Sequence, residues 1–293
     1  MTQNAPSQAN NRLGILLMTV TTLVFALQDG VSRHLAGEYN TYLVVMIRYW
    51  FFALFVLALS SRQSGGLRQV MQTNHLWMQV GRGALLALEI CVTVYAFTLL
   101  GLTETHAIFI CYPLIIAALS GPVLGEKVGW RRWSAIGVGA MGVMIILQPG
   151  SGVFSPAAVV PLIGALMFAL YGLMTRYVAR GDTAQTSFFY TGTVGCVVMT
   201  AIGVFFWEPI AGPDWFWMAL LCCSGVFGHW LLIRTYDVAE ASAVQPFAYL
   251  QLPFAAALGM VAFGETLRSN VAIGAAIVLG AGLFTWWRER QAR

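Results

Sequence analysis

Ten long apolar runs follow one another along this chain, and they constrain its fold more than any other feature. Most have about 20 residues, the length that a helix needs to cross a bilayer, and short breaks rich in Gly, Pro, Asn or charge separate them. Only 10% of the residues are charged, against about 25% in soluble domains. The sequence therefore predicts an all-α membrane protein of ten transmembrane helices. The runs cover residues 13–34, 41–60, 76–100, 105–124, 133–148, 157–178, 186–206, 215–232, 239–263 and 271–287.

The basic side chains indicate which helix ends face the cytoplasm, because Lys and Arg collect in cytoplasmic loops. With ten helices, Arg33 and Arg268 fall on one side of the membrane, Arg48 and Arg82 lie within spans, and all other basic residues fall on the opposite side. We therefore predict that both termini are cytoplasmic, with tails at residues 1–11 and 288–293. The larger group contains Arg12, Arg62, Arg68, Lys127, Arg131, Arg132, Arg176, Arg180, Arg234, Arg288, Arg290 and Arg293.

The first half of the chain resembles the second. The segment LVFAL at 23–27 aligns with LMFAL at 166–170, and at the same offset Arg33 aligns with Arg176. The later matches are Glu104 with Glu240, Pro113 with Pro253, and the Gly-Glu turn at 125–126 with the one at 264–265. Residues 12–150 and 151–287 are thus predicted to be two copies of one five-helix unit. Since five is odd, the second copy is inverted in the membrane, an arrangement typical of secondary transporters.

These motifs resemble a known family. The duplicated five-helix unit, the proline in the fourth helix of each unit and the Gly-Glu turn before each fifth helix are similar to the EamA-type transporters of the drug/metabolite transporter superfamily. The likeness is greatest to bacterial exporters of amino acids, including aromatic ones, and of metabolites. It implies a multi-pass protein of the cell inner membrane. It also implies a central cavity walled by helices 1, 3, 4, 6, 8 and 9, with helices 5 and 10 at the edge.

Charged side chains inside the predicted spans are the first candidates for a site, because a charge in the bilayer is costly unless it faces protein or water. Asp29, Arg48 and Glu89 fall at similar depths at 1.5 Å per residue. Asp29 and Arg48 could form an ion pair, with either a structural or a functional role. Arg82 lies seven residues before Glu89, which puts both on one helical face that we expect to look inward.

Further polar and aromatic residues lie on the predicted cavity helices. Histidines could relay a proton or contact a carboxylate, although packing is the commoner role, and tyrosines could stack on a ligand or anchor the helix at the interface. His106 is also placed at a polar-facing helix end. The predicted substrate-binding residues are Gln28, Asp29, Arg82, Glu89, Tyr112, Tyr171, His229, Gln245 and Tyr249.

Three prolines interrupt the fourth and ninth predicted helices. Pro113, Pro246 and Pro253 each remove a backbone donor and free a carbonyl about one turn earlier, so each predicts a kink. In a transporter such kinks can serve as gating hinges; the alternative is a bend that neighbouring helices accommodate.

Secondary transport by alternating access explains these features best. We expect export of amino acids or similar small metabolites; the alternative within transport is uptake of a vitamin or a nucleotide-derived metabolite. Direct use of ATP is excluded because Lys127, the one lysine, lacks the Gly-rich phosphate-binding spacing. An intramembrane enzyme is the alternative from another class, but no paired metal-ligand motif supports it. We predict no enzyme activity, cofactor, metal or nucleic-acid partner; the expected partners are a small-molecule substrate and the lipid bilayer, with proton coupling possible through Asp29 or Glu89.

Overall fold

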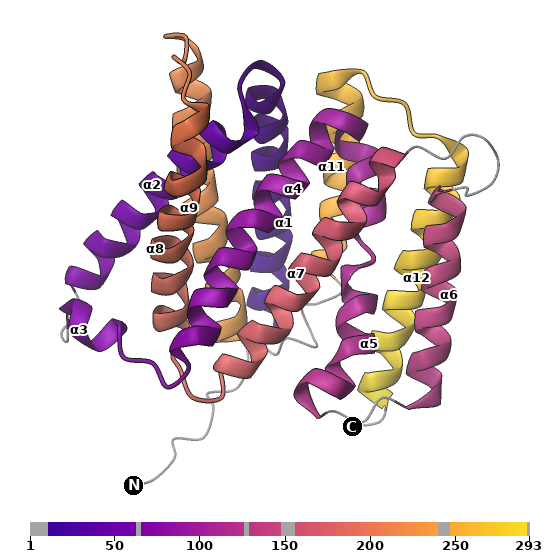
Figure 1. Ribbon diagram of the computed structural model, residues 1–293. Coiled ribbons are helices and arrows are strands. Elements are labelled where there is room, and N and C mark those ends of the chain that lie inside the picture. Colours follow the sequence, from indigo (N-terminus) through magenta and orange to yellow (C-terminus); the bar gives the residue numbers. More distant parts are fainter. Residues whose placement is uncertain (1–10, 63–65, 126–128, 148–155, 240–246, 292–293) are drawn as a thin grey trace, which may run out of the picture.

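The computed structural model describes residues 11–62, 66–125, 129–147, 156–239 and 247–291, and within these ranges the chain contains helices and no strands (Figure 1). Six helices are long and apolar enough to cross a membrane, and four shorter apolar helices accompany them. The predicted all-helical membrane fold is confirmed, whereas the count of ten spans and the cytoplasmic termini stay predictions. The helices are α1 (Asn11–Glu38), α2 (Thr41–Ser61), α3 (Gly66–Val70), α4 (Leu76–Phe109), α5 (Tyr112–Leu124), α6 (Trp130–Leu147), η1 (Pro156–Ala158), α7 (Val159–Val178), α8 (Ala184–Gly203), η2 (Val204–Phe206), α9 (Asp214–Val238), α11 (Gln251–Phe263) and α12 (Ser269–Gln291).

Two of the predicted spans are not single straight helices. The runs 76–100 and 105–124 meet inside α4, which kinks at Gly101, where φ is 79°, a value that favours glycine. The chain then breaks again after Phe109, and α5 starts at Tyr112. In the second half, α11 starts only at Gln251, after a turn, although the apolar run begins at residue 239. Both late starts precede a proline, whose ring favours the first turn of a helix over its interior.

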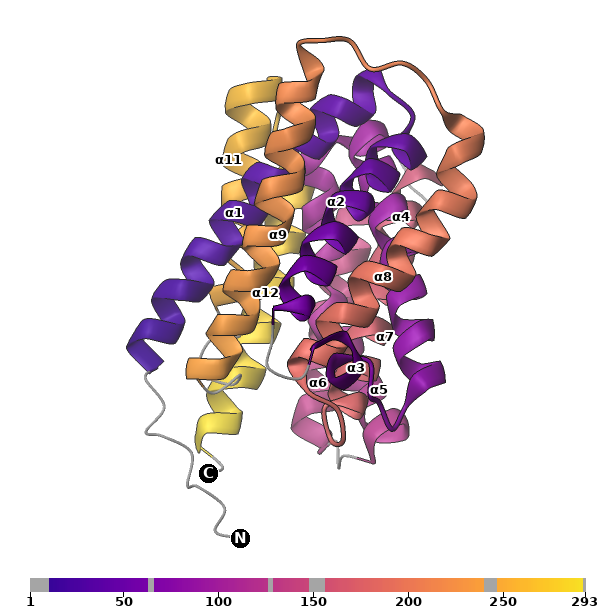
Figure 2. The same ribbon diagram turned by 90° about the vertical axis from the view of Figure 1, so that its left-hand side faces the viewer.

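The helices pack in pairs that join the two predicted halves of the chain. The most extensive pairs are α1 with α9, α4 with α7, α2 with α8, and α6 with α12, and Figures 1 and 2 show these helices side by side. In each pair, one helix comes from residues 12–150 and the other from 151–287. The halves therefore interlock, and a site at the centre of the bundle draws residues from both.

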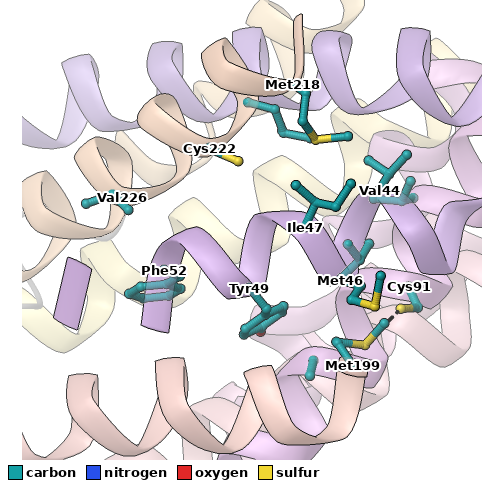
Figure 3. Packing of buried hydrophobic residues seen from close by; sticks show 14 of the residues in the cluster. Val44, Met46, Ile47, Tyr49, Phe52, Cys91, Met199, Met218, Cys222 and Val226 are labelled. Atoms are coloured by element: carbon teal, nitrogen blue, oxygen red, sulfur yellow. Dashed lines mark hydrogen bonds between the residues drawn. The ribbon is translucent and has the colours of Figure 1, made fainter. Parts of the chain in front are cut away.

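Two apolar clusters flank that centre. The first lies between α2, α4, α8 and α9, and Figure 3 shows Met46, Phe52, Cys91 and Met199 within it. The second lies between the α4–α5 break, α6, α11 and α12. Buried apolar side chains stabilise such packing through dispersion contacts, because lipid offers no hydrophobic contrast. The polar side chains lie between and beside these clusters.

The start of α1 and the end of α12 lie at the same end of the bundle, which we call the terminal end (Figure 1). The turn between α11 and α12 lies at the opposite end.

Candidate functional site

A small cavity lies where the two helix breaks face each other. Its volume is about 20 Å³, enough for one water-sized group. Irregular backbone is tolerated at membrane depth only where it is buried in protein or lines a cavity, so the breaks mark this place as a candidate site. The lining residues come from the end of α4, the start of α5 and the segment that leads into α11: His106, Phe109, Ile110, Tyr112, Ala248, Tyr249, Gln251 and Leu252.

A carboxylate from α1 contacts two residues that line this cavity. The Oδ2 atom of Asp29 accepts a hydrogen bond of 3.0 Å from Nε2 of Gln251, and it lies 3.2 Å from Nε2 of His106. Both partners line the cavity, so a protonated imidazole would form an ion pair here. The predicted pair of Asp29 with Arg48 is wrong, because the contacts of the Asp29 carboxylate are made to α4 and α11.

Aromatic rings continue from the cavity along α5 and α7. The ring of Phe168 has its centroid 5.5 Å from that of Phe109, 4.9 Å from Tyr112 and 6.0 Å from Tyr171. These separations are those of favourable aromatic pairs. Phe168 thus links Tyr112 and Tyr171, two predicted site residues. Phe168 itself was not predicted as a site residue, although it lies in the repeated segment 166–170.

The aromatic row ends at a buried cation. Arg82 is 1% exposed, and its Nη1 donates to the hydroxyls of Tyr171 (3.1 Å) and Thr175 (3.3 Å). The other donors bind Oε1 of Gln79, at 3.2 and 2.9 Å, and the backbone carbonyl of Ser187. These acceptors are all neutral. Because no carboxylate among them balances the guanidinium, the row ends in a positive charge.

Glu89 lies on the same helix as Arg82 but has separate contacts. It is 3% exposed, and its Oε1 accepts a hydrogen bond of 2.6 Å from Oγ1 of Thr93. A Cβ on Gly164 of α7 would lie 2.8 Å from that Oγ1, so α7 closes over this position. Glu89 also lies within electrostatic range of Asp29 and Arg48, which makes it part of the central group of charges.

The remaining predicted site residues have different surroundings. His229 packs its ring 5.4 Å from Phe25 and 5.7 Å from Phe52, and it is not one of the residues that line the cavity. Tyr249 lines the cavity, and its hydroxyl occupies the space that a side chain at Gly282 of α12 would fill. Gln245 and Pro246 lie outside the described residues.

Of the three prolines predicted to be hinges, Pro113 and Pro253 lie in the described residues. Both lie at the start of a helix and do not bend a continuous one. Pro113 is the second residue of α5, and Pro253 is the third residue of α11. The expected kinks are therefore breaks with a short connecting turn, because the proline leaves the preceding turn without a donor. The hinge role of these residues stays a prediction.

A carboxylate at the opposite end joins three elements and was not predicted as a site residue. Glu265 accepts hydrogen bonds from the backbone N–H groups of Leu102 (2.8 Å) and Thr103 (2.9 Å), just after the kink of α4, and it forms an ion pair with Arg33 of α1. A Cβ on Gly101 would collide with its side chain. The repeated Gly-Glu turn was the signal, since it places an acidic group beside exposed backbone donors.

A third polar network lies at the terminal end. Asp182, in the turn between α7 and α8, accepts hydrogen bonds from Nε2 of Gln79 (2.9 Å), the backbone N–H of Asn74 (3.0 Å) and the hydroxyl of Thr73. Burial raises the pKa of this carboxyl, but the hydrogen bonds and the nearby His75 outweigh it, so the pKa lies below its ordinary value. Through Gln79, this carboxylate helps to orient Arg82.

Broken helices, interlocked halves and buried charges are typical of membrane transporters. The family comparison is more specific: the model of the EamA-like transporter family matches residues 12–148 and again 155–287. The chain belongs to this family, as the sequence motifs predicted. It is a transporter and not an enzyme.

The similar proteins include riboflavin transporters and S-adenosylmethionine uptake transporters. The chain is 28% identical to a riboflavin transporter of Vibrio cholerae over 96% of this chain and 95% of that protein. It is 29% identical to a riboflavin transporter of Rhizobium johnstonii, over 95% of this chain and 92% of that protein. It is 23% identical to an S-adenosylmethionine uptake transporter of Rickettsia prowazekii, over 95% of this chain and 94% of that protein. These names fit the uptake alternative better than amino-acid export.

A solved crystal structure shares the fold. The two sequences are 16% identical, and the structures superpose with a TM-score of 0.63. The match covers 98% of this chain and 100% of the chain in the crystal structure. At this identity the likeness shows the fold alone.

Proposed function

We propose that this protein imports a vitamin or nucleoside-like metabolite with a fused heteroaromatic ring across the bacterial inner membrane. The similarity to riboflavin and S-adenosylmethionine transporters over almost the whole chain carries this proposal. The two named compounds share a nitrogen-containing fused ring system joined to a hydroxylated five-carbon unit. A site for either must therefore offer flat apolar surface for the ring and polar groups for the hydroxyls.

The geometry supports such a substrate. The row of Phe109, Tyr112, Phe168 and Tyr171 offers ring faces beside the cavity, and stacking of a heteroaromatic base on an aromatic side chain contributes about 1–3 kcal/mol. Asp29 with Gln251 at one end of the row and Arg82 at the other supply polar partners. Export of amino acids or similar small metabolites, the first prediction from sequence, has less support, because the riboflavin and S-adenosylmethionine transporters fit the uptake alternative better.

Transport by alternating access would use the two helix breaks. The α4–α5 break and the turn before α11 line the same cavity, so movement at one could open the cavity to one face and movement at the other to the opposite face. Asp29 beside His106 provides a place where a proton could bind with the substrate.

The proposal is tested by uptake into proteoliposomes that contain the purified protein. Radiolabelled riboflavin and S-adenosylmethionine are supplied outside, with and without a pH gradient, and phenylalanine and tryptophan are compared. We expect saturable uptake of one of the first two compounds. Transport of the amino acids without either heteroaromatic compound would overturn the proposal.

A matched pair of variants tests the aromatic row. Phe168→Ala removes the ring that contacts three others and should raise the KM about fivefold to a hundredfold, the equivalent of one lost stacking contact. Phe205→Ala is the control, because that ring is 82% exposed. Equal KM values for the two variants would show that the row does not contact substrate.

A further inference from the structure

A carboxylate and an imidazole meet inside the bundle without a hydrogen bond between them. Nε2 of His106 lies 3.2 Å from Oδ2 of Asp29, and the two side chains are 6% and 15% exposed. Among the described residues, this buried nitrogen has no aligned hydrogen-bond partner. Buried polar atoms are nearly always hydrogen-bonded, so an idle nitrogen this close to a carboxylate needs an explanation.

A proton on the imidazole supplies the missing interaction. While His106 is neutral, the ionised Asp29 places an unbalanced negative charge inside the bundle, which is costly at membrane depth. Protonation turns the close contact into an ion pair with a charge-assisted hydrogen bond, and the pair then has no net charge.

The charges around this pair favour the same proton. Glu89 lies within electrostatic range of both Asp29 and Arg48. With a neutral imidazole, these two carboxylates and one guanidinium add up to one negative charge, and a proton on His106 brings the sum to zero. The central group of charges is therefore balanced only in the protonated state.

The neighbouring helices offer little competition for this role. α11 (Gln251–Phe263) carries no titratable side chain. Further charged or titratable side chains on α1, α4 and α9 have partners of their own: Arg33 with Glu265, His34 with Trp217, Arg82 with Tyr171, Glu104 with Arg268, Asp214 with Tyr39, and His229 with Phe25 and Phe52.

The cavity connects this pair to water and to substrate. His106 and Gln251 both line the cavity, which has room for one water-sized group that can deliver a proton. Gln251 also donates its hydrogen bond of 3.0 Å to Asp29, so one side chain touches both the cavity and the carboxylate. Glu89, by contrast, is bonded to Thr93 beneath α7 and does not line the cavity.

We propose that Asp29 and His106 form the binding site of one proton that enters the cell with each substrate molecule. This inference rests on the proposed function and adds the co-transported ion. The proton passes from hydronium on the outer side to the imidazole, and from the imidazole to water on the cytoplasmic side. Because Gln251 contacts both sites, binding of the substrate and binding of the proton favour each other.

The first test is accumulation by the parent protein in proteoliposomes. The probe is whichever of riboflavin and S-adenosylmethionine the parent takes up, the interior is about two pH units above the exterior, and potassium with valinomycin holds the voltage at zero. One proton per substrate permits at most about a hundredfold accumulation, because one pH unit corresponds to about tenfold. We expect more than about tenfold, lost when a protonophore is added. Uptake that stops at equal concentrations inside and outside would overturn the inference.

Two variants separate proton binding from substrate binding. In Asp29→Asn the amide oxygen can still accept from Gln251, but no charge remains to hold a proton on His106. We expect Asn to retain counterflow, the exchange of labelled for unlabelled substrate at equal pH, and to lose accumulation. His106→Gln should show the same split, and it covers the case in which the first variant does not fold.

Asp214→Asn is the matched control. Asp214 makes the same kind of contact, a hydrogen bond of 2.6 Å from the hydroxyl of Tyr39, but it lies at the start of α9 and does not line the cavity. This variant should accumulate substrate like the parent. Parental accumulation by Asp29→Asn would overturn the assignment. Loss of counterflow in both folded variants would also overturn it, because the two residues would then bind substrate instead of a proton.

The outcomes also distinguish this inference from the proposed function. A parent protein that takes up one of the two compounds without any effect of the pH gradient would overturn the proton site and leave the proposed function standing. A parent protein that takes up neither compound would overturn both.

Discussion

Replacing Glu265 with glutamine should destabilise the protein far more than an ordinary surface charge change. The carboxylate accepts two backbone hydrogen bonds at the kink of α4 and pairs with Arg33, and its side chain is 12% exposed. Glutamine keeps the size but has one acceptor oxygen, so one of the N–H groups of Leu102 and Thr103 would face an amide NH₂. Arg33 would lose its partner, apart from the ring of Phe263 at 4.1 Å.

The magnitude follows from these contacts. A hydrogen bond to a charged group contributes about 1.5–3 kcal/mol, and Glu265→Gln weakens two of them together with one ion pair. We expect a loss of about 2–4 kcal/mol in the free energy of unfolding, because glutamine retains part of the bonding. At about 2–4 °C per kcal/mol for a chain of this size, Tm should fall by roughly 5–15 °C.

The assay is thermal unfolding of the purified protein in detergent, with Glu104→Gln as the matched control. Glu104 pairs with Arg268 at the same end of the bundle, but the side chain of Arg268 is 46% exposed. Such an exposed pair contributes less than about 1 kcal/mol. A similar small change of Tm in both variants would refute the claim that Glu265 fixes the α4 kink.

Three more predictions follow from single contacts. Asp182→Asn should lower Tm at pH 7, and the difference from the parent should shrink as the pH falls through the lowered pKa of Asp182, because a carboxylate with a depressed pKa stabilises the fold only while ionised; a difference independent of pH in thermal scans would contradict this. Glu89→Gln should reduce transport in proteoliposomes at least tenfold with normal folded yield, since the amide can still accept from Thr93; parental transport would make Glu89 structural. Pro113→Ala should slow transport with little change of Tm, because the α4–α5 break would close into a continuous helix; parental rates would argue against a hinge.

The fold was more predictable from the sequence than the pairing of side chains. Long apolar runs leave few alternatives to helices in a bilayer. Pro113 and Pro253 marked the places where two of these runs are interrupted. Depth along a helix, however, does not give its rotation. Gln28 and Asp29 are consecutive and so point about 100° apart; the first faces Arg48 across Gly225, and the second faces His106 and Gln251.

The same reasoning explains which site residues were missed. Gln251 and Phe168 sit in apolar runs whose inward face is fixed only by tertiary packing, so nothing local distinguishes them from lipid-facing positions. Glu265 was visible as part of a turn motif, but its role depends on a backbone kink at Gly101 about 160 residues earlier in the chain. Contacts of that separation are decided by how the two halves interlock.

The helix breaks and the buried charges are best understood together. A break in an apolar run leaves backbone groups without helical partners, and a charge in the same region needs polar surroundings; each is costly alone in a bilayer. In this protein the breaks before α5 and α11 line one cavity, and Asp29 contacts two of the lining residues, Gln251 and His106. The unpaired backbone groups and the buried charge therefore share one polar region of the bundle. A scaffold selected for stability alone has no reason to keep either feature, because a continuous apolar helix would pack at lower cost. Their coincidence at the junction of the two halves, in a chain that belongs to a transporter family, is what a substrate path through the centre of the bundle requires.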